Sequence, residues 1–171
     1  MEPRMIERGE MTIVGMVYYG DPFHAEGVAP EQNEVGRLWT RFNAYWDGHR
    51  DAFRRVVDER VGWELHIATA EYEENKAYYV MVGLEVSAIE DLPGPVFAKV
   101  LPAGTYAVFT LRGAEMTRNW SDAIYRDWLP SSDYEEAIGC TLERYDEARF
   151  RGWGEPGSEI EVWVPIRARR G

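Results

Sequence analysis

The sequence of 171 residues is poor in the side chains that hold metal ions and cross-link small domains. It contains one cysteine, Cys140, so neither an intramolecular disulfide nor a thiolate metal cluster can form. Its three histidines, His24, His49 and His66, lack the spacing of metal ligands. The sequence also has no glycine-rich phosphate loop. We therefore expect no metal and no cofactor, and we interpret Cys140 as a buried structural thiol.

The chain also lacks long apolar runs and an export signal. No stretch approaches the roughly 20 apolar residues that a membrane-spanning helix needs. Residues 1–10 are polar and charged, unlike the start of a signal peptide. These absences predict a cytoplasmic protein that does not associate with a membrane.

Positive charge is scarce as well. The 19 lysines and arginines are outnumbered by 30 aspartates and glutamates, and the formal net charge is -11. Such a surface repels phosphate groups, so we expect no nucleic acid to bind this chain alone. It attracts cationic ligands, although solubility alone would explain most of the charge.

The sequence does contain an internal repeat. Three pairs of segments have matching shapes and follow the same order in both halves: residues 12–20 and 105–113, 61–65 and 138–142, 79–84 and 161–166. In each half a tryptophan-centred helical segment separates the first strand from the second. The order predicts one domain, 1–171, with pseudo-repeats at about 1–91 and 95–171 and a ligand groove at the pseudo-dyad between them.

The periodicity of each half predicts the elements of an α+β fold. Alternating apolar residues favour strands, and helical spacing of apolar residues favours two main helices on one face of the sheet. We expect strands at 12–19, 61–68, 77–86, 96–101, 105–111, 138–145 and 159–167, and helices at 31–46 and 116–129. Residues 102–104 (Pro-Ala-Gly) are expected to form a hairpin turn, and Pro130 to stop the second helix. The fold class is therefore a duplicated β-α-β-β unit.

Strand parity sorts the side chains into two faces. Two aliphatic rows are expected to lie under the helices: Ile160, Val162, Val164 and Ile166 in the last strand, and Val80, Val82, Leu84 and Val86 in its counterpart. The other parity mixes acids with aromatic and sulfur side chains, namely Glu161, Trp163, Tyr79 and Met81. We expect Glu143 and Tyr145 to point to the same side as Glu161, and Trp39 of the first helix to reach the rim.

A carboxylate among aromatic rings is suited to binding a cation, because the charge pairs with the acid while ring quadrupoles hold the cationic body. The ten tyrosines and seven tryptophans are more than a core of this size usually contains. The alternative is that Glu143 and Glu161 are solvated strand residues next to arginines.

Several motifs resemble the GyrI-like proteins, which include the effector-binding domains of AraC- and MerR-type multidrug regulators of bacteria. The matching segments are 37–39 (Arg-Leu-Trp), 83–86 (Gly-Leu-Glu-Val), 102–109, 142–145 (Leu-Glu-Arg-Tyr) and 161–166. The resemblance implies an antiparallel sheet with a central groove. It also implies a stand-alone member that binds cationic or lipophilic aromatic compounds in that groove, for sequestration or sensing. It also implies Glu143 as the main acid, with Glu161 second.

Three functions stay open at this point. The first is small-molecule binding by Glu143, Glu161, Trp163, Tyr145, Tyr79, Met81 and Trp39. The second is a hydrolase of electrophilic, cyclopropane-containing toxins, with Glu143, Tyr145 and Glu161 as catalytic candidates. The third is a protein-interaction module similar to a gyrase inhibitor. A binding protein, monomeric or weakly dimeric, is the leading hypothesis.

Overall fold

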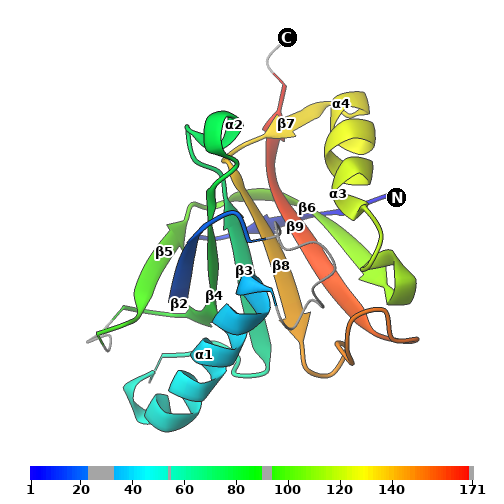
Figure 1. Cartoon of the computed structure of the whole chain (residues 1–171). Coiled ribbons are helices and arrows are strands. Elements are labelled where there is room, and N and C mark those ends of the chain that lie inside the picture. Colours follow the sequence, from blue (N-terminus) through cyan, green and yellow to red (C-terminus); the bar gives the residue numbers. More distant parts are fainter. Residues whose placement is uncertain (23–32, 54, 90–93, 170–171) are drawn as a thin grey trace. The chain divides into compact units, whose positions relative to one another are not determined.

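The computed structural model describes residues 1–22, 33–53, 55–89 and 94–169 (Figure 1). The chain divides into two compact units. We call Met11–Leu101 the N-terminal unit, and Met1–Glu10 together with Pro102–Gly171 the C-terminal unit. The single domain with its two pseudo-repeats and the groove between them stay predictions.

The N-terminal unit is an antiparallel sheet in the order β3-β4-β2-β5. Its strands are β2 (Met11–Gly20), β3 (Val61–Ile67), β4 (Tyr78–Val86) and β5 (Phe97–Leu101). Helix α1 (Glu34–His49) begins after Asn33, whose side chain accepts a hydrogen bond from the Gly36 amide. The expected start of this helix at residue 31, next to Pro30, lies outside the described residues. Short helical turns η2 (Arg50–Ala52) and α2 (Tyr72–Asn75) complete the unit.

The core of the N-terminal unit lies between α1 and the sheet. Val35, Leu38, Phe42 and Trp46 of the helix pack on one row of β4, made of Val80, Val82, Leu84 and Val86. The aliphatic row that the sequence places under the first helix is thereby confirmed. Within the sheet, Gly15 and Gly83 face each other across β2 and β4. A Cβ atom on either would overlap the carbonyl oxygen of the partner strand, so only glycine permits this approach.

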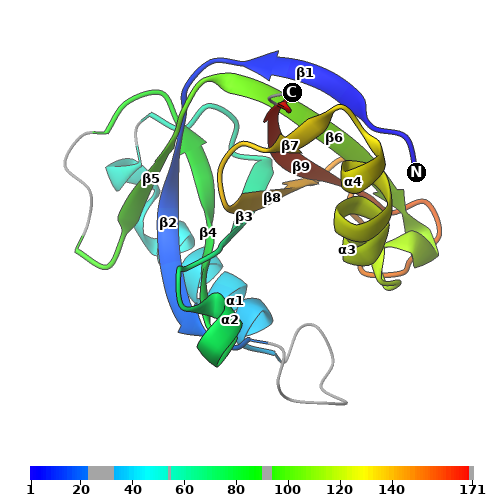
Figure 2. The ribbon, with the colours of Figure 1, turned by 90° about the horizontal axis from the view of Figure 1, so that it is seen from above.

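The C-terminal unit is built around β9 (Glu159–Ala168). One edge of β9 pairs with β6 (Gly104–Arg112), which in turn pairs with β1 (Arg4–Arg8), the strand seen along β6 in Figure 2. β9 also pairs with β8 (Cys140–Asp146) and β7 (Tyr134–Glu136). All these pairs are antiparallel, so the α+β class with antiparallel pairing is confirmed.

The second helical segment of the chain is less regular than expected. It consists of η3 (Gly113–Glu115), α3 (Trp120–Asp122), a π-helical stretch η4 (Ala123–Trp128) and α4 (Leu129–Ser131). The expectation that Pro130 stops this segment is wrong: Pro130 lies inside α4, because a proline is tolerated in the first turn of a new helical segment. Ile124 packs on Ile160, Val162, Val164 and Ile166, which confirms the second aliphatic row.

Two further sequence expectations need correction. β5 pairs with β2, and β6 pairs with β1 and β9, so residues 102–104 do not close a hairpin. Strands β1 and β7 were not expected, because their sequences are charged rather than apolar.

Among the described residues, no helix is both long and apolar enough to cross a membrane.

Candidate functional site

Glu143 is a buried carboxylate in the middle of β8, with 4% of its surface exposed. The register of β8 with β9 places it directly opposite Val162. Directly opposed residues of antiparallel strands share a face, and Val162 packs against Ile124 of η4. Glu143 therefore lies on what we call the helix-side face of the C-terminal unit.

Glu161 and Trp163 lie on the opposite face of the same sheet. In the register, Arg144 opposes Glu161, and Leu142 opposes Trp163. The expectation that Glu143 and Tyr145 point to the same side as Glu161 is therefore wrong. The parity of each strand is correct, but the relative register of β8 and β9 is one residue away from the one assumed.

Tyr145 accompanies Glu143 on the helix-side face. Its hydroxyl donates a hydrogen bond of 2.6 Å to Oε2 of Glu143. The Tyr145 ring meets Phe150 at 5.2 Å and Trp153 at 6.2 Å between centroids, both edge to face. Phe150 and Trp153 come from the loop between β8 and β9 and pack against the core of this face. A buried acid and a group of three aromatic rings are thus brought together by one strand and the loop that follows it.

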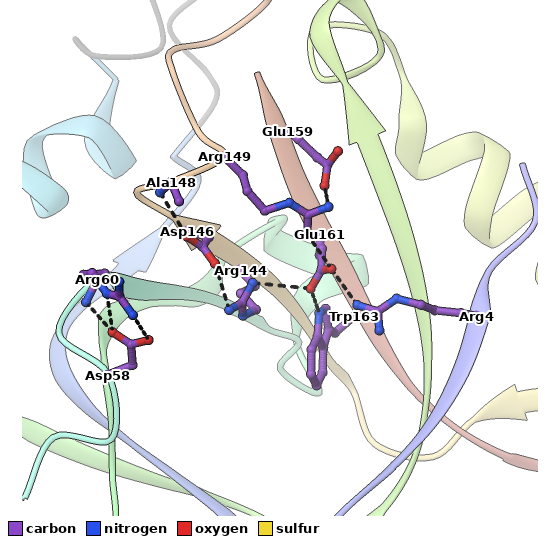
Figure 3. A network of polar contacts seen from close by, with 10 residues as sticks. All are labelled: Arg4, Asp58, Arg60, Arg144, Asp146, Ala148, Arg149, Glu159, Glu161 and Trp163. Carbon is purple, nitrogen blue, oxygen red and sulfur yellow. Dashed lines mark hydrogen bonds and ion pairs between the residues drawn. The ribbon is translucent and has the colours of Figure 1, made fainter. Parts of the chain in front are cut away.

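Glu161 has a different environment, shown in Figure 3. Its carboxylate lies 2.5 Å from Nη2 of Arg4, 3.3 Å from Nη1 of Arg149 and 3.7 Å from Nη1 of Arg144. Trp163 donates its indole N–H to Oε2 of Glu161 at 3.1 Å. The charge of this buried acid, 5% exposed, is therefore compensated by protein groups from β1, β8 and the loop before β9. A ligand role for Glu161 stays a prediction, and an incoming cation would have to compete with these arginines.

The arginines around Glu161 are themselves shared with other acids, as Figure 3 also shows. Arg149 pairs with Glu159, and Arg144 lies 3.2 Å from Oδ2 of Asp146. These contacts connect the start of β9 to the end of β8. The opposite face of the C-terminal unit is thus a network of alternating charges, which is a stabilising arrangement rather than an open acidic surface.

A further buried acid lies in the N-terminal unit. Glu64 of β3 is 4% exposed and opposes Val82, so it lies on the face that α1 covers. Trp39 of α1 donates its indole N–H to Oε2 of Glu64 at 2.7 Å, and Nε2 of His66 lies 2.8 Å from Oε1. Sequence reasoning named Trp39 but missed Glu64 and His66. The signal was present, because an acid inside the apolar strand 61–67 must be paired when buried.

Tyr79 and Met81 lie on the face of the N-terminal sheet opposite α1. Met81 is 2% exposed and opposes Leu65, which makes it a core residue of that face. Tyr79 is exposed and packs on Tyr19 at 4.7 Å between ring centroids. The acid and aromatic residues expected in one row are therefore distributed over both faces of the C-terminal sheet, whereas Tyr79 and Met81 share one face of the N-terminal sheet.

A further acid, Glu136 of β7, was also missed. It opposes Ile166, which places it on the helix-side face of the C-terminal unit together with Glu143. Burial raises the pKa of Glu136, although a hydrogen bond from the Cys140 amide opposes the shift. The Tyr125 hydroxyl of η4 bonds to the Thr141 hydroxyl nearby. Burial raises the pKa of Tyr125, and the Glu136 carboxylate raises it further.

Within the N-terminal unit, Glu64 and His66 are the adjacent groups with the chemistry of metal ligands.

Residues 4–166 match the family model of Cass2, described as an integron-associated effector binding protein. The chain belongs to this family. Because the match spans nearly all of both units, the resemblance to effector-binding domains is confirmed.

Relatives of this Cass2-family chain include a longer regulator. The transcriptional regulator BrlR of Pseudomonas aeruginosa is 30% identical over 167 residues, which cover 97% of this chain and 56% of BrlR. The chain thus spans little more than half the length of this curated relative.

Two solved structures share the fold at low identity. The structure of SAV2435 bound to tetraphenylphosphonium has a TM-score of 0.67 and 16% identity, and the match covers 98% of this chain and 94% of SAV2435. The C-terminal domain of EcmrR has a TM-score of 0.66 and 12% identity, with 98% of each chain covered. At these identities the likeness shows the fold alone.

Proposed function

We propose that this Cass2-family chain binds cationic or lipophilic aromatic small molecules, with Glu143 as the charge partner. The observation that carries the proposal is the buried Glu143 carboxylate, which is held by the Tyr145 hydroxyl beside a group of aromatic rings. Binding would serve either to sequester a toxic compound or to sense it. The proposed setting is the cytoplasm.

The chemistry of this arrangement favours a cation over an anion or a neutral polar ligand. A buried carboxylate has lost most of its hydration, so a cation that reaches it recovers part of that loss. Tyr145, Phe150 and Trp153 add the negative faces of their rings, which attract cations by roughly 0.5–2 kcal/mol per good contact. A lipophilic cation uses both contributions at once, whereas a small inorganic cation would stay hydrated.

The family and its structural neighbours support the same ligand class. SAV2435 was solved with tetraphenylphosphonium, a cation whose charge is enclosed by four aromatic rings. BrlR is a transcriptional regulator, and the matching part of EcmrR is its C-terminal domain. A sensing role for the present chain is therefore as well supported as sequestration.

The test compares tetraphenylphosphonium with triphenylphosphine oxide, a neutral compound of similar shape. Affinity is measured by titration calorimetry and by quenching of tryptophan fluorescence. Glu143→Gln keeps the size of the side chain and should weaken the cation by roughly 1–3 kcal/mol, because it removes a charge-assisted contact. The neutral compound should change much less. Glu147→Gln, at an exposed position just after β8, is the control for net charge.

The proposal fails if both ligands lose affinity equally in Glu143→Gln, or if Glu147→Gln weakens the cation as much. Tyr145→Phe provides a graded variant, since it removes the hydroxyl bonded to Glu143 and leaves the ring. It should weaken the cation less than Glu143→Gln does.

A hydrolase is the second candidate, and the contact between Tyr145 and Glu143 at 2.6 Å is the observation that favours it. In that mechanism Glu143 takes a proton from water while the water oxygen bonds to a carbon of a strained ring. The ring C–C bond breaks, its electron pair moves into the attached conjugated system, and that system gains a proton from Tyr145. Stoichiometric binding of such a compound without any product after long incubation would exclude this candidate.

A further inference from the structure

Glu136 and Glu143 lie on the same face of the C-terminal unit but at different heights along β9. Glu136 opposes Ile166 and Glu143 opposes Val162. These two partners are four residues apart, which corresponds to about 13 Å along a strand. β7 and β8 thus present two carboxylates on one face, separated by a distance that a single long molecule can span.

The group between the two acids is aromatic. Thr141 precedes Glu143 by two residues on β8 and therefore shares its face. The Thr141 hydroxyl forms a hydrogen bond with the hydroxyl of Tyr125. Tyr125 belongs to η4 and packs on the core of this face. The Glu136 carboxylate also acts electrostatically on the Tyr125 hydroxyl, so Tyr125 lies near Glu136. Its hydrogen-bond partner Thr141 is two residues from Glu143 on the same face of β8.

Glu136 differs from its neighbours in how its charge is compensated. The adjacent Glu135 points to the other side of β7 and pairs with Nε of Arg167 at 2.7 Å. Glu159 and Glu161 have arginine partners as well. Within the described ranges of the chain, Glu136 makes no ion pair and accepts a backbone hydrogen bond from Cys140. A half-buried carboxylate of this kind gains more from an external cation than a paired one does.

We propose that Glu136 is a specificity-determining residue that selects elongated ligands with two cationic centres, one for Glu143 and one for Glu136. The inference rests on the proposed function, because it takes Glu143 as the first charge partner. Two acids at this separation favour a dication whose charges lie roughly 13 Å apart over a monocation of the same length. The tyrosine between them contacts the apolar middle of such a ligand.

The experiment uses decamethonium, a ten-carbon chain with a quaternary ammonium at each end, and decyltrimethylammonium, the same chain with one such group. Hexamethonium serves as a dication that is too short to reach both acids. Affinities of the wild-type chain and of Glu136→Gln are measured by titration calorimetry. We expect Glu136→Gln to weaken decamethonium roughly tenfold, and decyltrimethylammonium and hexamethonium by less than about twofold.

Glu135→Gln is the matched control. It removes the same charge from the neighbouring position on the other side of β7, and it should leave all three affinities unchanged. Equal losses for decamethonium and decyltrimethylammonium in Glu136→Gln would overturn the proposal, as would no loss for either. A loss of decamethonium binding in Glu135→Gln would show that net charge alone is responsible, and would also overturn it.

A second measurement needs no variant and covers the case in which Glu136→Gln does not fold. The titratable groups near Glu136 are Tyr125 on η4, whose pKa is raised by burial, and Cys140 on β8. Because burial raises the pKa of Glu136, a larger part of this acid is protonated in a mildly acidic buffer than of an ordinary glutamate. Decamethonium should then release protons on binding, detected by calorimetry in two buffers, and decyltrimethylammonium should release fewer. Equal proton release would contradict the proposal.

The two proposals fail in distinguishable ways. If tetraphenylphosphonium binds through Glu143 but decamethonium depends on Glu136 no more than the monocation does, the further inference is wrong and the proposed function stands. If no cation depends on Glu143, both are wrong.

Discussion

Glu161→Gln separates a structural acid from a ligand-binding acid. In the structure the carboxylate of Glu161 is 5% exposed, is contacted by three arginines and accepts the indole N–H of Trp163. Glutamine keeps an acceptor for Trp163 but removes the negative charge. The guanidinium groups of Arg4, Arg144 and Arg149 then lose a shared counter-charge.

The expected magnitude follows from how exposed the three arginines are. Removing one partner of a fully buried pair costs about 3–5 kcal/mol, whereas an exposed pair contributes at most about 1 kcal/mol. Arg144 is 22% exposed, and Arg149 and Arg4 are 43% and 52% exposed, so water compensates the latter two in part. Arg144 and Arg149 also keep Asp146 and Glu159 as partners. We therefore expect Glu161→Gln to lower the free energy of unfolding by about 2–3 kcal/mol.

The assay has two parts. Urea denaturation followed by tryptophan fluorescence gives the free energy of unfolding, and a thermal scan should show a midpoint lower by roughly 4–12 °C. Titration with tetraphenylphosphonium then gives the affinity at a temperature where both proteins are folded. Because Glu161 lies on the face opposite Glu143, the affinity should change less than about twofold, unlike in Glu143→Gln.

Two results would refute this reasoning. A loss of stability below about 0.5 kcal/mol would mean that the arginines are fully compensated by water and the other acids. A tenfold loss of tetraphenylphosphonium affinity with unchanged stability would return Glu161 to the ligand site, as the sequence had suggested. Arg4→Met is the companion variant, and it should cost less than Glu161→Gln because one pair of the network is lost instead of three.

Three further predictions concern other parts of the chain. Gly83→Ala should destabilise the protein by about 3 kcal/mol or more or prevent folding, whereas Gly48→Ala, where a Cβ meets nothing within 4 Å, should be neutral or stabilising, as measured by urea denaturation. Trp39→Phe should lower the free energy of unfolding by about 1–3 kcal/mol in the same assay, because Glu64 loses its indole donor while burial of the ring is largely kept. A loss near zero would show that water replaces the donor. The pKa of Glu136 is raised in the folded state, so the free energy of unfolding falls as the pH rises from the ordinary glutamate range through that pKa. Glu136→Gln should therefore be more stable than the wild-type chain at neutral pH and should lose this gain in acid. A stability difference that does not depend on pH would contradict this prediction.

Much of the local structure was predictable because its causes are local. Alternating residues in 159–167 predicted β9 and its aliphatic row, and helical spacing in 31–46 predicted the packing face of α1. Strands β1 and β7 were not predicted because neither carries an apolar row. β1 pairs with β6, and β7 pairs with β9. Their pairing depends on the partner strand rather than on their own composition.

The candidate site was predictable in kind but not in arrangement. The motif 142–145 correctly singled out a buried acid with a tyrosine two residues later, and the contact between them follows from strand parity. The role of Glu143 in binding stays a prediction. The contacts of Glu161 with Arg4 and Arg149 join residues that are far apart in the sequence, and no periodicity could reveal them.

The sequence by itself determined the family, the antiparallel α+β class and the aliphatic faces under the helices, because these depend on residue order and on periods of 2 and 3.6. Only the tertiary structure decided which acids share a face. Strand register is set by hydrogen bonds between segments that are distant in sequence, and a shift of one residue moves every side chain to the other side. The register of the strands therefore places Glu143 and Glu136, the proposed binding acids, on one face and Glu161, which belongs to the ionic network, on the other.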